Sequence, residues 1–151
     1  MEREIVERLA RDENTPHYVL EELVYAGDYD LLLVLAKNAG MPNYLLKELA
    51  TLEIEDNGEL KRNVAQNPNT SYETLDVLSM DENAIVRAAV ASGIYVPVDI
   101  LELLSNDENP VVRFNVADNP RTPYNIKLEL WQDKEVLEVL SHFAERLSKK
   151  D

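Results

Sequence analysis

The stretch VRFNVADNPRTPYNI, residues 112–126, closely repeats LKRNVAQNPNTSYET, residues 60–74. Both contain a Val-Ala pair, an Asn-Pro pair and a threonine at matching positions. Similarity at a fixed period indicates a repeat architecture, which decides the fold before any single helix or strand is considered. The alanine of the pair recurs at intervals of 26, 29, 26 and 26 residues, at Ala10, Ala36, Ala65, Ala91 and Ala117.

Two apolar stripes accompany each of these alanines. The position before the alanine and the position five before it are apolar in every repeat, a spacing typical of one buried face of a short helix. A leucine follows each alanine by thirteen residues, at Leu23, Leu49, Leu78, Leu104 and Leu130. We therefore expect each repeat to contain a short helix of about two turns and a longer one of about three turns. Neither is long enough to be stable alone, so the repeats must stack.

Polar residues mark the corner between the two helices. Two residues past the alanine stand Asn38, Asn67, Gly93 and Asn119. Asparagine and glycine readily adopt the left-handed conformation that closes a helix, and we expect that role for them. Thr15 and Thr122 each precede a proline, which predicts that their hydroxyls cap the second helix. Thr70 with Glu73 predicts a capping box.

The pattern predicts an all-α fold: a single repeat domain, residues 1–151, built as an α-solenoid of five two-helix repeats. The repeats are expected at about 3–28, 29–57, 58–83, 84–109 and 110–135, followed by a capping helix at 136–149. The three residues that lengthen one interval are expected within 51–59, where Asp56, Asn57 and Gly58 favour a turn. The last helix is amphipathic, with apolar residues on one side and charges opposite.

Residues 86–107, VRAAVASGIYVPVDILELLSND, and residues 112–130, VRFNVADNPRTPYNIKLEL, resemble the leucine-rich repeat variant (LRV) family. Its repeat has a Val-Arg-x-x-Val-Ala start, an Asn-Pro-x-Thr-Pro corner and a Leu-x-x-Leu helix. The resemblance covers residues 3 to about 135. It implies a right-handed superhelix in which a layer of α-helices alternates with a layer of short, often 3₁₀, helices, in the style of HEAT and armadillo arrays.

The match to the family differs along the chain. Arg87 and Arg113 occupy the family's arginine position, Lys61 is a conservative replacement, and Val6 and Leu32 depart from it. The resemblance implies little about activity. Some relatives carry a cysteine-rich iron–sulfur segment beside the repeats, which has no counterpart in this sequence.

Composition excludes several classes of function. The 151 residues include no cysteine, which excludes disulfides, thiolate metal sites and a cysteine nucleophile. The formal charge of −14 opposes binding to nucleic acids and anionic membranes and is compatible with a basic protein partner. The longest apolar run, residues 31–36, is too short to cross a bilayer, and residues 1–20 do not resemble a signal peptide. We therefore expect a cytoplasmic protein.

Catalytic motifs are absent from the sequence. The two histidines, His17 and His142, lie at opposite ends of the repeats, and no zinc-protease, nucleophile-elbow or phosphate-loop motif occurs. We predict no catalytic, cofactor-binding or metal-binding residue and no enzymatic activity. Arg87 and Arg113 each follow an aspartate by six residues and could form a row that grips a carboxylate partner. A charge pair within the array that orients the corner is the simpler interpretation.

The candidate binding residues lie where the repeat pattern is broken by apolar side chains. Helical spacing predicts that Leu33 and Val34 of the second repeat lie on the outward face of their helix, and Ala88 and Phe114 occupy corresponding positions in later repeats. The corner of the fourth repeat reads SGIYVP in place of the usual polar sequence. Such residues either cover the neighbouring repeat or form an exposed patch for a protein partner or a second copy of the chain. The predicted partner-binding residues are Leu33, Val34, Ala88, Ile94, Tyr95 and Phe114.

Three hypotheses for function follow. The first is a non-enzymatic interaction module that presents an extended solenoid surface to a protein or peptide. The second is a metal-dependent factor or small enzyme that binds a divalent cation through Glu53, Glu55, Asp56 and Glu59. The third is an acidic mimic of nucleic acid that binds a basic protein, with a steep dependence on salt.

Overall fold

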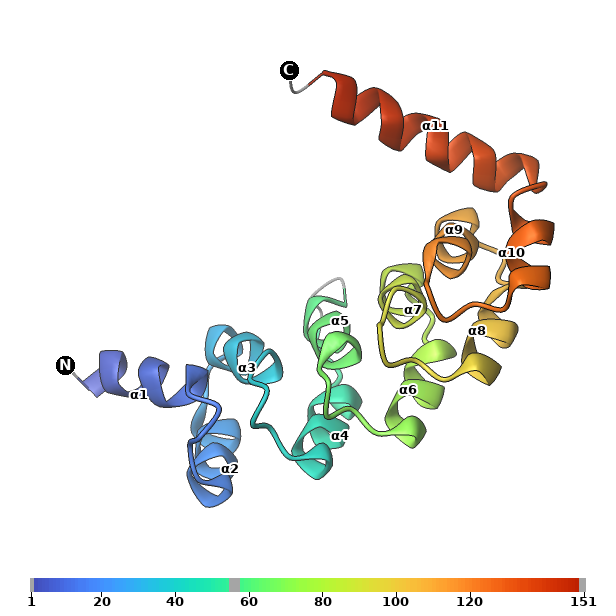
Figure 1. Ribbon diagram of the computed structural model, residues 1–151. Helices are drawn as coiled ribbons and strands as arrows, with labels where there is room; N and C mark the ends of the chain where they lie inside the picture. The colour runs from blue at the N-terminus through green and yellow to red at the C-terminus, as the bar shows by residue number, and fades with distance from the viewer. Residues whose placement is uncertain (1, 55–57, 150–151) are drawn as a thin grey trace. The chain divides into compact units, whose positions relative to one another are not determined.

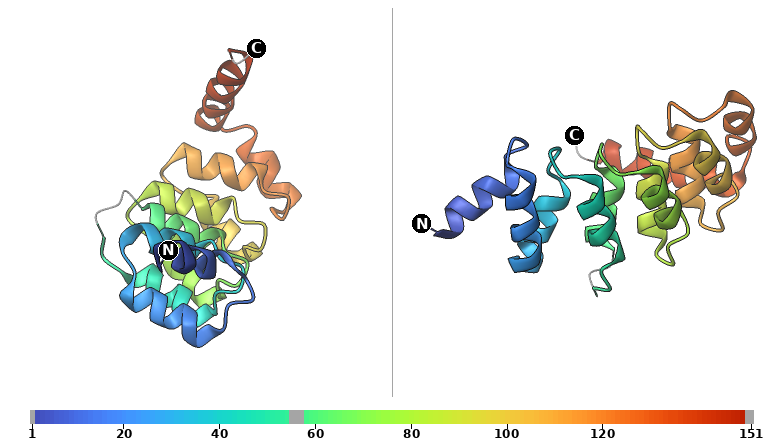
Figure 2. Two further views of the ribbon diagram at one scale, coloured as in Figure 1. Left: turned by 90° about the vertical axis from the view of Figure 1, so that its left-hand side faces the viewer. Right: turned by 90° about the horizontal axis from the view of Figure 1, so that it is seen from below.

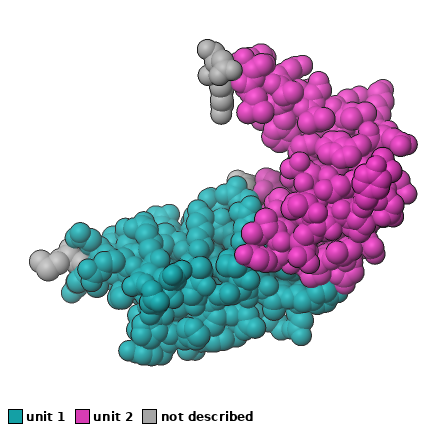
Figure 3. Space-filling model, viewed as in Figure 1, with its two compact units in different colours: residues 1–78 teal, residues 79–151 magenta. Residues whose placement is uncertain are grey.

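The fold is all-helical, as the sequence predicts. The computed structural model describes residues 2–54 and 58–149, and these residues form eleven α-helices and no strand (Figure 1). The chain divides into two compact units, residues 1–78 and residues 79–151 (Figure 3). Each unit is described by itself below.

The first unit is a two-layered stack of helices. Its helices are α1 (Glu2–Arg11), α2 (His17–Ala26), α3 (Tyr29–Ala36), α4 (Asn43–Thr51), α5 (Glu59–Gln66) and α6 (Tyr72–Ser79), the last of which ends one residue into the second unit. Helix α3 packs against both α1 and α5, while α2 packs on α1 and α3, and α4 on α3 and α5. The odd-numbered helices therefore form one layer and α2 and α4 the other (Figures 1 and 2).

The second unit has the same arrangement around α9. Its helices are α7 (Ala84–Ala91), α8 (Val98–Leu104), α9 (Pro110–Asp118), α10 (Tyr124–Leu130) and α11 (Lys134–Ser148). Helix α9 contacts α7 and α11 in its own layer and α8 and α10 in the other. The end of α11 extends beyond these helices (Figure 2), and residues 141–148 are exposed.

The expected helix lengths are partly wrong. The second helix of a repeat is not the longer one in this unit, because α8 and α10 have seven residues each while α7 and α9 have eight and nine. Both kinds of helix are α-helices in the described residues, rather than one α and one 3₁₀. Helix α8 ends at Leu104, and the hydroxyl of the next residue, Ser105, donates to the carbonyl of Glu102 and so competes with continuation of the helix.

The apolar columns form the core. The repeat alanines are all buried, as are the leucines thirteen residues later except the first, Leu23. The column five residues before the alanine is buried in the last three repeats, but Ile5 is 45% exposed and Leu31 is half-buried. In the second repeat the buried residue is Leu32 instead, at the position that holds Arg87 in the fourth. A leucine at this position can be buried without a partner, whereas a buried arginine needs a counter-charge and hydrogen-bond acceptors.

Buried asparagine side chains join successive repeats. In the first unit, Asn38 Nδ2 donates to the carbonyls of Ala10 (2.8 Å) and Asp12 (3.0 Å). One repeat later, Asn67 Nδ2 donates to the carbonyls of Ala36 and Asn38, both at 2.8 Å. These carbonyls lie at the end of the preceding odd-numbered helix, where no helical N–H reaches them. Each asparagine thus satisfies the helix end of the repeat before it.

The second unit contains the same interaction. Asn119 Nδ2 donates to the carbonyls of Ala91 (2.7 Å) and Gly93 (2.9 Å). The side-chain oxygen of Asn119 accepts from the backbone N–H of Arg121, two residues on, and so fixes its own corner as well. In the fourth repeat the equivalent position is Gly93, which has no side chain to make these bonds.

The predicted left-handed conformation is wrong for Asn67 and Asn119. Asn67 and Asn119 are extended, with φ −74° and ψ 131°, and φ −65° and ψ 127°. The extended backbone turns each side chain toward the preceding repeat, where it is almost fully buried. The only glycine with positive φ in the described residues is Gly58, before α5. Gly40 is needed for a different reason, since a Cβ there would lie 2.0 Å from the Glu13 carbonyl oxygen.

The predicted threonine caps are also wrong. Thr15, Thr70 and Thr122 turn back toward the helix they follow and donate to the carbonyls six residues earlier, at 2.7, 2.5 and 2.6 Å. Helices α2 and α10 start after prolines that have no capping side chain. Before α6 it is Ser71 that accepts from the Thr74 N–H, at 3.3 Å. The hydroxyls therefore complete the first helix of the repeat instead of starting the second.

Replacing Asn67 by alanine is expected to lower the free energy of unfolding by about 2–4 kcal/mol. The substitution leaves the buried carbonyl of Ala36 without its side-chain donor and the Asn69 N–H without an acceptor, and the Asn38 carbonyl keeps only the N–H of Met41. Equilibrium denaturation with urea measures the change.

The matched control is Asn106→Ala, because Asn106 is exposed and bonds only to Glu102 and Ser105 nearby. This change should cost less than about 0.5 kcal/mol. An Asn67→Ala variant as stable as the control would contradict the role assigned to the buried amide.

Candidate functional site

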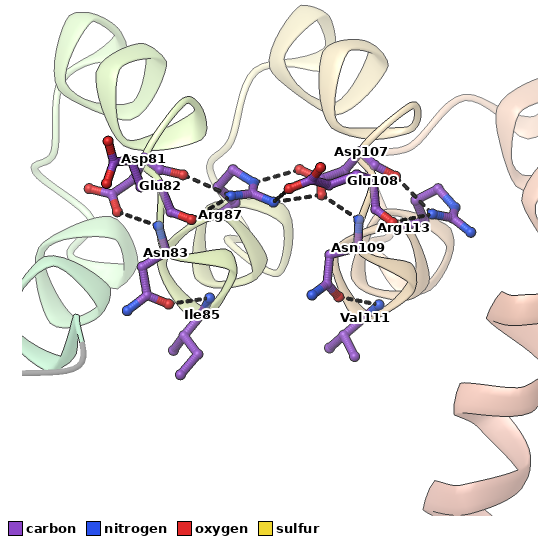
Figure 4. A network of polar contacts seen from close by, with 10 residues as sticks. All are labelled: Asp81, Glu82, Asn83, Ile85, Arg87, Asp107, Glu108, Asn109, Val111 and Arg113. Carbon is purple, nitrogen blue, oxygen red and sulfur yellow. Dashed lines mark hydrogen bonds and ion pairs between the residues drawn. The ribbon is translucent and has the colours of Figure 1, made fainter.

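Arg87 is the centre of a polar network in the second unit (Figure 4). Its side chain extends from α7 and is 10% exposed. The Nε and Nη2 atoms donate to the two carboxylate oxygens of Asp107 at 2.7 and 2.9 Å, a bidentate pair. The Nη1 atom donates to the backbone carbonyls of Asp81 and Glu82. Each of the three nitrogens of this buried guanidinium therefore donates a hydrogen bond to the protein.

Arg113 repeats this arrangement from α9. Its Nη1 donates to the backbone carbonyls of Asp107 (2.8 Å) and Glu108 (3.1 Å). Its Nε pairs with Asp133 at 2.9 Å and its Nη2 with Glu135 at 2.6 Å. The ion pairs thereby hold the start of α11 against α9.

The prediction of a structural charge pair within the array identified the role of these arginines but not their partners. The aspartate six residues before each arginine offers its backbone carbonyl, and the ion pair is made with the aspartate twenty residues after it. The earlier carboxylates are engaged locally: Asp81 accepts from the Asn83 N–H and Asp107 from the Asn109 N–H (Figure 4). Arg87 and Arg113 thus have no free donor row for a carboxylate partner.

These contacts change the ionisation of the aspartates. Burial alone would raise the pKa of Asp107, but the hydrogen bonds from Arg87 and from the Asn109 N–H, with the arginine's charge, outweigh it and lower the pKa. The hydrogen bond from Arg113 likewise lowers the pKa of Asp133. Folding therefore favours the ionised carboxylates. Their contribution to stability is present above the ordinary carboxyl pKa of 3.8 and is lost as the pH falls through the lower folded values.

Replacing Asp107 by asparagine is expected to destabilise the protein by about 3 kcal/mol at neutral pH. The amide presents an N–H to a buried guanidinium that has lost its counter-charge. The difference from the unmodified protein should shrink below about pH 3.8, where Asp107 becomes protonated in the unfolded chain and then in the folded one. Urea denaturation between pH 3 and pH 7 measures it.

Glu108→Gln is the matched control for this experiment. Glu108 pairs with the same arginine at 3.6 Å, but its side chain is 90% exposed, so its loss should cost less than about 1 kcal/mol. A gap between Asp107→Asn and the unmodified protein that stays constant on acidification would show that ionisation of Asp107 does not contribute.

The predicted partner-binding residues are divided between the two units. Leu33 and Val34 lie on α3 in the first unit and are half-buried. Val34 lines a crevice of about 390 Å³ with residues of α1, among them Arg3 and Glu7, which pair with each other. The other four lie in the second unit.

In the second unit, Ile94 and Tyr95 are the most exposed of these residues, at 63% and 61%. They lie in the corner between α7 and α8, next to Val96, which is 1% exposed. Arg121 Nε donates to the carbonyl of Val96 at 3.0 Å and ties this corner to the next one. Ile94 and Tyr95 are therefore displayed on a corner that is fixed on both sides. Ala88 is half-buried on α7.

Phe114 covers neighbouring aromatic side chains, which is the first of the two roles considered for the apolar residues that break the repeat pattern. Its ring, on α9, meets Trp131 edge to face with a centroid distance of 6.1 Å and stacks on Phe143 of α11 at 5.4 Å. The two aromatic contacts and the ion pairs of Arg113 together fix α11 on α9.

A crevice beside this aromatic group was not predicted from the sequence. It has a volume of about 240 Å³ and is lined by Val111, Val139, His142, Phe143 and Arg146. One sequence signal could have indicated it. The position six residues before the repeat alanine is acidic in the first three repeats, as Glu4, Asp30 and Glu59, but is Ile85 and Val111 in the last two. Ile85 and Val111 are 50% and 40% exposed.

Exposed tyrosines paired with carboxylates form a second unpredicted feature, on α2 and α4 of the first unit. The Tyr25 hydroxyl lies 3.1 Å from Glu48 and the Tyr44 hydroxyl 3.5 Å from Glu21. The hydrogen bond with Glu48 and its charge raise the pKa of Tyr25. Partial burial and the charge of Glu21 raise that of Tyr44. These pairs link neighbouring even-numbered helices.

The carboxylates considered for a metal site are only partly described. Glu53 and Glu59 belong to the described residues, while Glu55, Asp56 and the turn residue Asn57 lie outside them. Residues 2–54 and 58–149 contain no group of three or more acidic, histidine or cysteine side chains placed to hold a metal ion. Across the same ranges, no helix has the length and apolarity needed to cross a membrane.

No family model, no curated protein sequence and no solved structure matches this chain.

Proposed function

We propose that this chain is a non-enzymatic protein-interaction module, built as a right-handed α-solenoid of five two-helix repeats of the LRV type with a C-terminal capping helix. The register of the five alanines along the sequence supports the repeat number. The recurrence of the asparagine bonds in both units supports the repeat as the structural element. Its partner is a protein or peptide, and the charge of −14 favours a basic one.

The observation that carries the proposal is the display of Ile94 and Tyr95. Two large apolar side chains with more than half of their surface exposed stand on a corner whose backbone is fixed by buried Val96 and by Arg121. Aromatic and aliphatic side chains on a rigid element are typical anchors of protein interfaces. Because the corner is already ordered, binding there does not require a loop to lose conformational freedom.

The polar groups of the molecule support a binding role over a catalytic one. Arg87 and Arg113 are engaged by ion pairs and backbone carbonyls of the protein itself. Their hydrogen bonds hold helices together. The side chains that remain available to a partner are therefore those of the exposed surface.

Replacing Tyr95 by aspartate is expected to reduce partner capture at least tenfold while the midpoint of thermal unfolding stays within about 2 °C. The side chain is 61% exposed, so its loss from the surface removes an anchor without opening the core. Affinity capture from a lysate of the native cells, with mass-spectrometric identification, compares the two proteins.

Tyr124→Asp is the matched control, since Tyr124 is 76% exposed in the same unit but belongs to another corner. It should leave capture unchanged. Equal capture by all three proteins would remove the corner from the proposed interface, and unfolding of Tyr95→Asp would assign Tyr95 to the core.

A further inference from the structure

The crevice between α9 and α11 differs in chemistry from the rest of this acidic protein. Its walls are Val111 on one side and Val139 and Phe143 on the other, with His142 and Arg146 at its edge. No carboxylate lines it, although the chain has 29 acidic side chains and only 15 basic ones. The crevice is thus an apolar recess with a cationic edge.

The walls of the crevice are positioned by contacts outside it. Phe143 is held by stacking on Phe114, which Trp131 meets edge-on. Helix α11 is anchored at its start by Val136, which is fully buried, and by the ion pairs of Arg113. The recess therefore exists before any ligand arrives, which lowers the conformational cost of binding.

The guanidinium of Arg146 has hydrogen-bond donors that the protein does not use. The ion pairs among the described residues leave Arg146 without a carboxylate partner. His142 is engaged within its own helix, where Nδ1 donates to the backbone carbonyl of Glu138 at 2.8 Å. A guanidinium in this position can bind a carboxylate through two parallel N–H bonds.

The size of the recess limits the occupant. Sites for drug-sized ligands have volumes of about 300–1,000 Å³, and this crevice, at about 240 Å³, is smaller. It fits one large apolar side chain. Capture of a peptide's terminal carboxylate usually relies on several free backbone N–H groups, and the N–H of the lining residue Val111 already donates to Asn109. The carboxylate that would pair with Arg146 is therefore that of an aspartate or glutamate side chain within a peptide segment, and not a chain terminus.

We propose that this crevice binds an internal peptide segment in which a large apolar residue is next to an aspartate or glutamate. The apolar side chain enters between Val111, Val139 and Phe143, and the carboxylate pairs with Arg146. The rest of the segment is neutral or basic, because further acidic residues would be repelled by the net charge of −14. This inference rests on the proposed function, since it names a ligand for the interaction module.

The larger crevice of the first unit is a weaker candidate. Its arginines already have partners: Arg3 pairs with Glu7, Asp28 and Asp30, and Arg11 with Glu7. Its cationic groups are compensated by the protein itself and specify no ligand.

Fluorescence anisotropy with short labelled peptides tests the proposal on the full chain. Three peptides share a glycine–serine background and carry Phe-Glu, Phe-Gln or Ser-Glu at the centre. The Phe-Glu peptide should bind tightest. Arg146→Gln should weaken it roughly tenfold and leave the Phe-Gln peptide unaffected. Val111→Asp should abolish binding of both phenylalanine peptides.

Lys149→Gln removes the same charge directly after the same helix but lies outside the crevice, so it should bind like the unmodified protein. Equal affinity of the unmodified protein for the Phe-Glu and Phe-Gln peptides, or of Arg146→Gln and the unmodified protein for Phe-Glu, would overturn the proposal. So would a change in oligomeric state caused by Val111→Asp in sedimentation, because the crevice would then be a contact between copies.

The peptide assay and lysate capture fail independently. If no peptide binds while a partner is still captured through Tyr95, the crevice proposal is wrong and the interaction module stands. If the Phe-Glu peptide binds as expected and no protein is captured, the crevice stands and the corner of Ile94 and Tyr95 is not an interface.

Discussion

The asparagine two residues past the repeat alanine is the constraint on which the rest of the structure depends. A two-turn helix leaves most of its terminal carbonyls without a partner, and burying that end in a stack would be costly. The amides of Asn38, Asn67 and Asn119 supply two donors each to the preceding helix end. Short helices can therefore be stacked with their ends inside the protein.

This constraint explains why neighbouring features recur with it. The side-chain oxygen of each asparagine accepts from the N–H two residues on, so the same residue fixes its own corner. The close approach of corners leaves no room for a Cβ at Gly40. In the second unit the ion pairs of Arg87 and Arg113 add a second connection, at the opposite end of the helices, between residues twenty positions apart. The buried amides of Asn38, Asn67 and Asn119 and the guanidinium groups of Arg87 and Arg113 thus join one repeat to the next.

The surfaces left outside these connections differ between the two units. The first unit has tyrosine–carboxylate pairs on α2 and α4, and acidic residues at the position six before the alanine. The second unit has apolar residues at that position, an exposed Ile94 and Tyr95, and a crevice with a cationic edge. Because the residues that stack the repeats are distinct from these exposed residues, the surface can differ from repeat to repeat without loss of the core.

The sequence by itself determined the helical class, the period and most of the core, because apolar spacing within a short helix is a local property. It could not assign the partners of Asn67, Thr122 or Arg87. For each of them the same residue pattern is also compatible with a local role. That role is a left-handed turn for Asn67, a helix cap for Thr122 and a pair with the neighbouring aspartate for Arg87. Only the tertiary structure decided between them, since the acceptors that are actually bound lie 6, 20 or 31 residues away. The crevice of α9 and α11 likewise required it, because Val111 and Arg146 become neighbours only when the two helices pack.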